Sequence, residues 1–346
     1  MNVHEIYIKR CLELAKNGLP SAMPNPSVGA VIVYQNKIIG EGYTSKYGGN
    51  HAEVNAINSV KDKLLLCKST LYVSLEPCSH FGKTPPCADL IIKNKIENVV
   101  IGTLDSNEKV AGNGIKKLVE AGINVTVGVL EKECKDINKR FFTFHEHKRP
   151  YIILKWAESL DGYIAPISRE NQEPIWITNS ISRQLVHKWR SEEQAILVGT
   201  KTVLDDNPKL DVRDWNGKNP TRIILDKIGK ISSDYNVKDK KVKTIVITEQ
   251  ENLQSSDYLQ YEKCIFDNQL VAIICEILYK NNIQSVLIEG GTKTIQSFID
   301  ATIWDEARIF KGTIIFKNGT KAPILNYINA TKQTIINDEL LTIYKV

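Results

Sequence analysis

The sequence predicts a two-domain α/β protein. Short apolar stretches, with the length of buried strands, alternate with stretches of helical periodicity along most of the chain. A chain of 346 residues is too long for one average domain and suits two. A new strand pattern begins at Tyr151, directly after Arg149-Pro150. We therefore predict one domain over residues 1–146 and a second over 147–346.

The first half begins with an amphipathic helix, because apolar side chains recur at helical spacing from Ile8 to Ala15. Charged residues interrupt this segment throughout, which excludes a signal peptide. A hairpin is predicted next, where two apolar stretches flank a Gln-Asn turn. The later predicted helices cover 51–60, the stretch after Pro85-Pro86, and 115–121; the predicted strands cover 28–34, 37–40, 71–75, 98–102 and 125–129. Short buried strands between helices indicate a layered α/β sheet.

The second half again mixes strands and helices. Its predicted strands cover 151–156, 195–199, 222–226, 244–248 and 285–288, and its predicted helices cover 180–190 and 270–280. Residues 249–268 are polar and irregular, and we expect a loop or a poorly packed helix there. The two halves do not resemble each other, which indicates two different functions.

Composition limits the class of protein. The formal charge of +5 is compatible with a small anionic substrate and too weak to indicate a nucleic-acid partner. No apolar stretch is long enough to span a membrane. Seven cysteines without an export signal favour a reducing compartment, so we expect a cytoplasmic protein without a disulfide framework.

A metal-binding pattern stands out in the first half. His51 is followed by Glu53, then by Pro77-Cys78 and by Cys87. One imidazole and two thiolates are ligands that zinc prefers, and three protein ligands leave the fourth position to water, as in catalytic zinc sites. Zinc lowers the pKa of such a water, and the carboxylate of Glu53 would carry the proton to a leaving amine. His-x-Glu followed by Pro-Cys and a second Cys is typical of hydrolytic zinc deaminases, and we predict one zinc ion per chain.

The chain resembles the family of bifunctional riboflavin-biosynthesis deaminase/reductases. Cys78 and Cys87 are separated by eight residues, SHFGKTPP, instead of the two of the generic motif. This long insert distinguishes that family from tRNA and cytidine deaminases. The segments that carry the resemblance are PNPSVGAVIV (24–33), HAEV (51–54), LEPCSHFGKTPPC (75–87), VAGNGIKKL (110–118), LKWAESLDGYIA (154–165), WIT (176–178), DDNPKLDVR (205–213) and IEGG (288–291).

The resemblance implies two folds and two reactions. The first domain would be a cytidine-deaminase-like three-layer α/β/α domain, and the second a dihydrofolate-reductase-like α/β domain. The implied reactions are zinc-dependent deamination of 2,5-diamino-6-ribosylamino-4(3H)-pyrimidinone 5′-phosphate, followed by NADPH-dependent reduction of its ribosyl side chain. The expected partner is thus a small phosphorylated pyrimidine, without nucleic acid or membrane, and we also expect a homo-oligomer.

The resemblance also assigns residues to the deaminase pocket, namely Asn25, Lys83, Asp105 and Asn107. A lysine between the two metal cysteines suits a phosphate or a polarised carbonyl, although it could be an ordinary loop lysine. Two positions depart from the family pattern. Thr44 stands where the family usually has His, and Ser106 and Glu108 replace the prolines of an Asp-Pro-Asn-Pro turn. The first departure leaves open whether the chain makes the substrate contact that the family's His would provide.

In the second half, no Gly-x-Gly-x-x-Gly motif follows the first strand. Gly290-Gly291 instead connects a predicted strand to a helix, where backbone N–H groups can approach a pyrophosphate. By resemblance, the NADPH contacts are Ala157, Trp176, Thr202, Asp206, Gly291 and Thr292, and the substrate contacts are Arg190, Leu210, Arg213 and Glu289. Guanidinium groups suit a substrate phosphate, but Asp211 replaces the Thr of the family pattern Leu-Thr-Val-Arg and adds a negative charge beside Arg213. Lys155 or Asp161 could deliver a proton.

Two other functions remain as alternatives. One is a nucleic-acid base deaminase with an accessory C-terminal domain, which the weak net charge and the reductase-like second half disfavour. The other is a non-catalytic zinc module. Glu53 argues against that reading, because a structural zinc site needs no unliganded carboxylate beside it.

Overall fold

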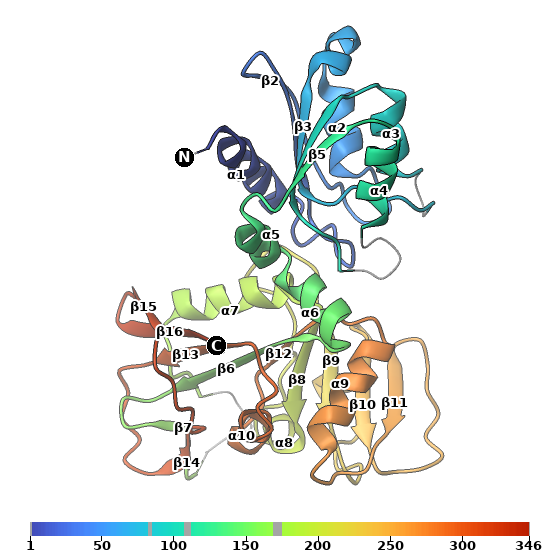
Figure 1. The fold of residues 1–346 in the computed structure, drawn as a ribbon. Helices are drawn as coiled ribbons and strands as arrows, with labels where there is room; N and C mark the ends of the chain where they lie inside the picture. Colours follow the sequence, from blue (N-terminus) through green and yellow to red (C-terminus); the bar gives the residue numbers. More distant parts are fainter. Residues whose placement is uncertain (1, 82–84, 107–111, 169–174, 346) are drawn as a thin grey trace. The chain divides into compact units, whose positions relative to one another are not determined.

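The computed structural model describes residues 2–81, 85–106, 112–168 and 175–345, and it divides into two units, Met1–Lys148 and Arg149–Val346 (Figure 1). The prediction placed the domain boundary between residues 146 and 147. Helix α6 (Lys139–His147) runs across that point, and its C-cap residue, Lys148, has a φ of 53° in the left-handed region. Because this helix packs Phe141 and Phe142 into the core of the first unit, that unit extends to Lys148.

The first unit is built on a five-stranded sheet in the order β2-β1-β3-β4-β5. Its strands are β1 (Gly29–Tyr34), β2 (Lys37–Tyr43), β3 (Thr70–Leu75), β4 (Asn98–Thr103) and β5 (Asn124–Val127). Strand β1 pairs antiparallel with both β2 and β3, whereas β3, β4 and β5 are parallel. The parallel pairs bring the ends of β3 and β4 to the same edge of the sheet.

Helices cover both faces of this sheet, because its strands are apolar on both sides. Along β1, Ala30 and Ile32 point into one core, while Val31 and Val33 point into the other. The first core is closed by α2 (Ala52–Ser59), α3 (Cys87–Lys93) and α4 (Asn113–Glu120), and the second by α1 (Val3–Lys16) and α5 (Glu131–Ile137), on the opposite side of the sheet in Figure 1. The predicted three-layer α/β/α arrangement is confirmed.

Helix α2 lies directly on β2. A Cβ atom added at Gly42 would approach the backbone of Ala52 and Ala56 to 2.5 and 2.4 Å. Only glycine permits that approach. The close packing sets the start of α2, and with it the positions of His51 and Glu53.

The second unit contains a nine-stranded sheet in the order β11-β10-β9-β8-β12-β6-β13-β16-β15. Its strands are β6 (Tyr151–Glu158), β8 (Ala195–Gly199), β9 (Thr221–Leu225), β10 (Thr244–Thr248), β11 (Leu259–Lys263), β12 (Ser285–Ile288), β13 (Glu306–Lys311), β15 (Thr331–Ile335) and β16 (Asp338–Tyr344). The strands from β11 to β13 in this order are parallel, and β16 and β15 are antiparallel to their neighbours. Strands β7 (Tyr163–Pro166) and β14 (Gly319–Lys321) form a separate pair.

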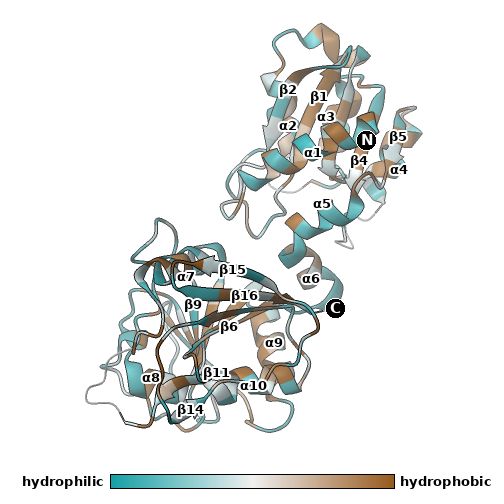
Figure 2. Ribbon diagram, turned by 90° about the vertical axis from the view of Figure 1, so that its left-hand side faces the viewer, coloured by the Kyte–Doolittle hydropathy of each residue, from teal (hydrophilic) through white to brown (hydrophobic). Residues whose placement is uncertain are grey.

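Helices also cover both faces of the larger sheet. Helices α9 (Leu270–Lys280) and α10 (Thr292–Asp300) close the largest apolar core, and α9 is hydrophobic over most of its length (Figure 2). Helices α7 (Ser180–Glu192) and α8 (Thr200–Asp206) pack on the other face, through Val186 and Val203. In a parallel sheet of this kind, ligands bind beyond the carboxyl ends of the strands, which here means the residues after β6, β8, β9 and β12.

One prediction of secondary structure is wrong. Residues 249–268 were expected to form a loop or a poorly packed helix, but they contain the edge strand β11. Its sequence, LQYEK, has no apolar run, and as the terminal strand of the described sheet it is half-buried from Leu259 to Glu262 and exposed at Lys263. Strands β13, β15 and β16, at the end of the chain, were not predicted from the sequence.

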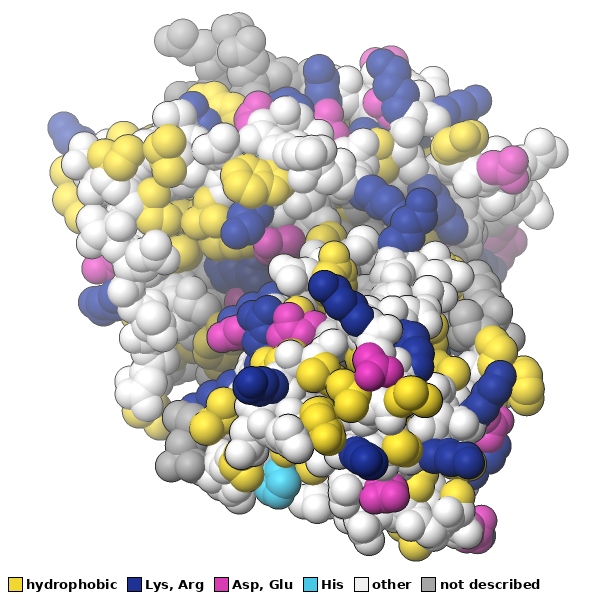
Figure 3. Space-filling model, turned by 90° about the horizontal axis from the view of Figure 1, so that it is seen from above, with side chains coloured by type: hydrophobic (Ala, Val, Ile, Leu, Met, Phe, Trp, Pro, Cys, Tyr) yellow, Lys and Arg dark blue, Asp and Glu magenta, His cyan; other side chains and the backbone are white. Residues whose placement is uncertain are grey.

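Among the described residues, no helix combines the length and the apolar character that crossing a membrane requires. Seen from above, Lys and Arg side chains are interspersed with Asp, Glu and hydrophobic side chains (Figure 3). This mixed pattern agrees with the small formal charge of the chain.

Candidate active sites

The predicted metal ligands lie together in the first unit. His51 precedes α2, Cys78 lies just after β3, and Cys87 is the first residue of α3. The Nδ1 atom of His51 lies 3.6 Å from the Sγ of Cys78 and 3.3 Å from the Sγ of Cys87. The candidate ligand atoms all lie within 4.8 Å of one another. One nitrogen and two sulfurs at this spacing fit a tetrahedral zinc ion with one position left for another ligand.

The two cysteines differ in their surroundings. The backbone N–H of Cys87 donates to the Sγ of Cys78 at 3.3 Å. Hydrogen bonds with Cys87 and His51 lower the pKa of Cys78, against the opposing effect of burial. A lowered pKa favours the thiolate of Cys78, which is the form that binds zinc.

Glu53 lies in the first turn of α2, and only 4% of its surface is exposed. Burial raises the pKa of Glu53 to about 7, against the opposing effect of the charge on His51. A buried carboxyl group beside the metal ligands, with a pKa near neutrality, can both accept and donate a proton.

The other residues predicted for the deaminase pocket are only partly described. Asn25 is half-buried in a turn, where its N–H donates to the carbonyl of Ala22 at 3.0 Å. Asp105 is buried just after β4. Lys83 and Asn107 lie outside the described residues. The roles of all four in substrate binding remain predictions.

Thr44, which departs from the family pattern, is buried beside the start of β1. Its Oγ1 accepts the N–H of Val28 at 2.9 Å, and its own N–H donates to the carbonyl of Val28 at the same distance. These bonds extend the pairing of β1 with β2. The hydroxyl is thus engaged by the backbone of the fold.

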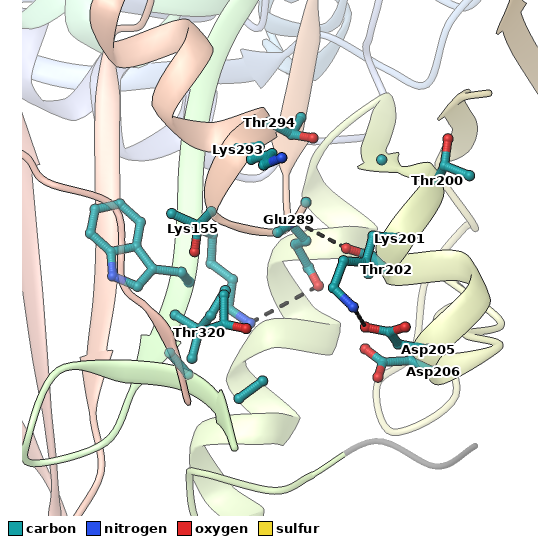
Figure 4. A pocket seen from close by; sticks show the side chains of 18 of the residues that line it. Lys155, Thr200, Lys201, Thr202, Asp205, Asp206, Glu289, Lys293, Thr294 and Thr320 are labelled. Carbon is teal, nitrogen blue, oxygen red and sulfur yellow. Dashed lines mark hydrogen bonds and ion pairs between the residues drawn. The ribbon is translucent and has the colours of Figure 1, made fainter. Parts of the chain in front are cut away.

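The second unit contains a cavity of about 840 Å³ beyond the carboxyl ends of its central strands (Figure 4). This volume suits a cofactor or a small substrate. Nine of the ten residues predicted for this half line the cavity: Ala157, Trp176, Arg190, Thr202, Asp206, Arg213, Glu289, Gly291 and Thr292. Leu210 does not line it. Its side chain is buried in the core formed with Val203, and its φ is 51°.

One side of the cavity is formed where α8 and α10 begin. The N–H of Gly291 donates to Thr202 Oγ1 at 3.0 Å, which joins the two helix starts (Figure 4). Thr292 is the first residue of α10, and its hydroxyl donates to the carbonyl of Lys321. Threonines and lysines of both helices therefore border the same space.

Three charged groups form another wall. The guanidinium of Arg190 donates to both carboxylate oxygens of Glu289, at 3.1 and 2.7 Å. The Nζ of Lys155 lies 4.0 Å from the same carboxylate (Figure 4). Burial alone would raise the pKa of Glu289, but the charges of Arg190 and Lys155 lower it to about 2. Burial lowers the pKa of Lys155.

The structure separates the two candidate proton donors. Lys155 lines the cavity, whereas Asp161 does not. The carboxylate of Asp161 accepts the N–H groups of Phe316 and Lys317 and the hydroxyl of Ser159. Asp161 therefore stabilises a turn, and Lys155 is the candidate that faces the cavity.

Arg213 is held by the residue that departs from the family pattern. Its Nη1 donates to Asp211 Oδ1 at 2.9 Å. Arg190 contacts the same segment through the carbonyl of Asp211, at 3.2 Å. The negative charge of Asp211 is thus paired with Arg213, the residue predicted to bind the substrate phosphate.

His187 is a cavity residue that the sequence analysis missed. It is 4% exposed and lines the cavity. Its Nδ1 accepts the N–H of Arg213 at 3.4 Å, and its Nε2 lies 3.3 Å from the carboxylate of Asp214. The available signal was its position three residues before Arg190, which places both side chains on the same face of a helix.

Comparison with known proteins agrees with both sites. Residues 1–103 match the zinc-binding region of cytidine and deoxycytidylate deaminases, and residues 150–325 match the RibD C-terminal domain. The chain is 41% identical to the riboflavin biosynthesis protein RibD of Aquifex aeolicus, over 90% of this chain and 88% of that protein. It is 35% identical to the RibD of Escherichia coli, over 88% and 86% of the two chains.

Solved structures agree over the full length. The deaminase/reductase of Thermotoga maritima has a TM-score of 0.87 and 38% identity, covering 99% of each chain. A RibD of Acinetobacter baumannii has a TM-score of 0.85 and 29% identity, covering 99% of this chain and 98% of that one. The predicted family and fold class are confirmed. An accessory domain on a nucleic-acid deaminase would not explain the match of residues 150–325. The chain therefore belongs to the RibD family of riboflavin biosynthesis enzymes, with a zinc-binding deaminase domain followed by a reductase domain.

Proposed function

We propose that the first unit deaminates 2,5-diamino-6-ribosylamino-4(3H)-pyrimidinone 5′-phosphate and that the second reduces the product, 5-amino-6-(5-phosphoribosylamino)uracil, with NADPH. The observation that carries the proposal is the convergence of His51, Cys78 and Cys87 within 4.8 Å beside the buried Glu53. The relative from Thermotoga maritima, which is named for the same two reactions, supports the choice of substrates.

In deamination, His51, Cys78 and Cys87 would hold the zinc ion. When bound, zinc supplies a Lewis acid that makes a water molecule reactive near neutral pH. Glu53 takes a proton from the attacking water and delivers it to the departing amino group. The bond from carbon to the amino nitrogen breaks and ammonia leaves. The oxygen of water becomes the new carbonyl oxygen, and its second proton goes to the adjacent ring nitrogen. Burial of Glu53 keeps this proton away from bulk solvent.

In reduction, the cavity of the second unit would hold NADPH along the starts of α8 and α10. When bound, the nicotinamide supplies the hydride, and the protein orients it against the substrate carbon. Arg190 and Arg213 are the cations that would receive the substrate phosphate. Lys155 lies on the same wall and would provide the proton that completes the reduction.

Two assays on one preparation test the proposal. Ammonia release from the diaminopyrimidine phosphate should require zinc, and a chelator should stop it. Loss of NADPH absorbance should follow addition of the deaminated substrate, with or without the chelator. Ammonia release that persists without metal would refute the deaminase mechanism, and unchanged absorbance would refute the reductase assignment.

A further inference from the structure

Glu76 is a buried carboxylate that no prediction assigned to a role. It follows β3 directly and precedes Pro77 and the metal ligand Cys78. Only 4% of its surface is exposed. Within the part of the chain that the structure describes, it forms no ion pair with Lys, Arg or His. A buried charge needs compensation from hydrogen-bond donors or an opposite charge.

That compensation comes from four backbone N–H groups. Glu76 Oε2 accepts from Gly112 at 3.0 Å and from Asp105 at 3.3 Å. Glu76 Oε1 accepts from Gly114 at 2.9 Å and from Ile115 at 3.3 Å. Hydrogen bonds to an ionised acceptor are stronger than those between neutral groups.

The four donors belong to two segments that are remote from Glu76 in the sequence. Gly112, Gly114 and Ile115 form the start of α4, whose first N–H groups have no partner within the helix. Asp105 follows β4, the strand beside β3, and is one of the residues predicted for the deaminase pocket. A single carboxylate thus joins the start of α4 and the end of β4 to the strand end that carries Cys78.

Steric packing fixes the same junction independently. A Cβ atom added at Gly114 would lie 2.0 Å from the carbonyl oxygen of Pro77. The first turn of α4 therefore rests directly on the backbone beside Cys78, and only glycine permits this contact. A shift of α4 would have to displace the loop that carries the metal ligand.

We propose that Glu76 is a positioning residue of the deaminase site. It holds the Pro77-Cys78 loop, Asp105 and the start of α4 in one arrangement, so that the metal and the substrate pocket keep a set distance from each other. This inference rests on the proposed deaminase function. Its consequence is that loss of these hydrogen bonds impairs deamination while the reductase unit is unaffected.

The main test replaces Glu76 by Gln. The amide retains one acceptor oxygen, and its NH₂ group faces N–H donors that it cannot bond. We expect amide hydrogen exchange at Gly112, Gly114 and Ile115 to accelerate. We expect kcat/KM for ammonia release to fall about 10- to 100-fold, since small displacements in a site have effects of that size. Zinc content and NADPH-dependent reduction of the deaminated substrate should stay within twofold of the unsubstituted chain.

Matched variants separate positioning from general damage. Glu120→Gln changes an exposed carboxylate at the other end of α4, which pairs with Lys116, and should leave deamination unchanged. Gly114→Ala leaves Glu76 intact but forces the Pro77 backbone to move, and should lower deamination as Glu76→Gln does. If Glu76→Gln does not accumulate as a folded protein, Glu76→Asp, which keeps the charge on a shorter side chain, should show the same losses in weaker form.

The outcomes are distinct. Faster exchange with unchanged kcat/KM would show that Glu76 stabilises α4 only, and would overturn the proposal. Unchanged amide hydrogen exchange in Glu76→Gln would overturn it as well, because the hydrogen bonds of Glu76 would then not restrain the start of α4. Absence of ammonia release in the unsubstituted chain would instead refute the proposed function.

Discussion

Arg190 and Glu289 form a bidentate ion pair on the wall of the cavity in the second unit, with N–O distances of 3.1 and 2.7 Å. Arg190 comes from α7, and Glu289 follows β12. The pair thus joins a helix on one face of the sheet to the carboxyl end of a central strand. Both residues were also predicted to contact the substrate, and that role remains a prediction.

Because of this ion pair, we expect the second unit to lose stability at acidic pH. The pKa of Glu289 is lowered from 4.5 to about 2, so its contribution to stability is present above pH 4.5 and is lost as the pH falls from 4.5 towards 2. We expect that contribution to be about 3 kcal/mol. The Tm of the second unit, measured from pH 3 to 7, should be lower in Glu289→Gln than in the unsubstituted chain. This difference in Tm should become smaller as the pH falls. A Tm difference that does not depend on pH would contradict stabilisation by the ionised form of Glu289.

Asp211 is expected to compete with the substrate phosphate for Arg213. Their ion pair is partly exposed, with 24% of Asp211 and 42% of Arg213 accessible, and such pairs contribute up to about 1 kcal/mol. Asp211→Asn should therefore lower the KM of the reductase for its phosphorylated substrate by up to about fivefold. Asp234→Asn, which changes an exposed carboxylate paired with Ser232, is the control. An unchanged KM in Asp211→Asn would contradict the competition between Asp211 and the substrate phosphate.

His187 is expected to make substrate binding sensitive to acid. Burial, together with the charges of Arg190 and Arg213, lowers its pKa below 6.5, against the opposing charge of Asp214. The ring is therefore neutral at pH 7 and accepts the N–H of Arg213. Protonation as the pH falls removes that acceptor, and we expect the reductase KM to rise about fivefold, the equivalent of one hydrogen bond.

The measurement compares KM from pH 5 to 8 in the unsubstituted chain and in His187→Gln. The amide of glutamine can still accept and donate but does not titrate in this range. Titration of the substrate phosphate affects both proteins equally. If the two profiles coincide, His187 has no part in the pH dependence.

Glu53→Gln is expected to separate metal binding from proton transfer. The side chain keeps its size, and His51, Cys78 and Cys87 keep their positions, so zinc content should be unchanged. Ammonia release should fall by about 10²- to 10⁴-fold, the usual contribution of a general acid and base. Reduction of an already deaminated substrate should be unaffected. Substantial deamination by the zinc-loaded variant would assign the proton transfer to another group.

Much of the fold was predictable because buried parallel strands consist of consecutive apolar residues. The predicted strands over 71–75, 195–199 and 285–288 correspond to β3, β8 and β12. Edge strands lack this signal. Strand β15, TKQTI, is exposed at every position but Ile335, and β11 is half-buried along most of its length. Their pairing is set by neighbouring strands and not by their own composition.

The amino-acid sequence by itself predicted the metal ligands and Glu53, because their chemistry is encoded in residue types at characteristic spacing. Only the tertiary structure determined the contacts of Glu76 and His187. Glu76 finds its donors 29 to 39 residues away, and His187 finds Arg213 26 residues away. Side-chain hydrogen bonds of this kind depend on which strand ends and helix starts meet in space, and no local pattern specifies that meeting.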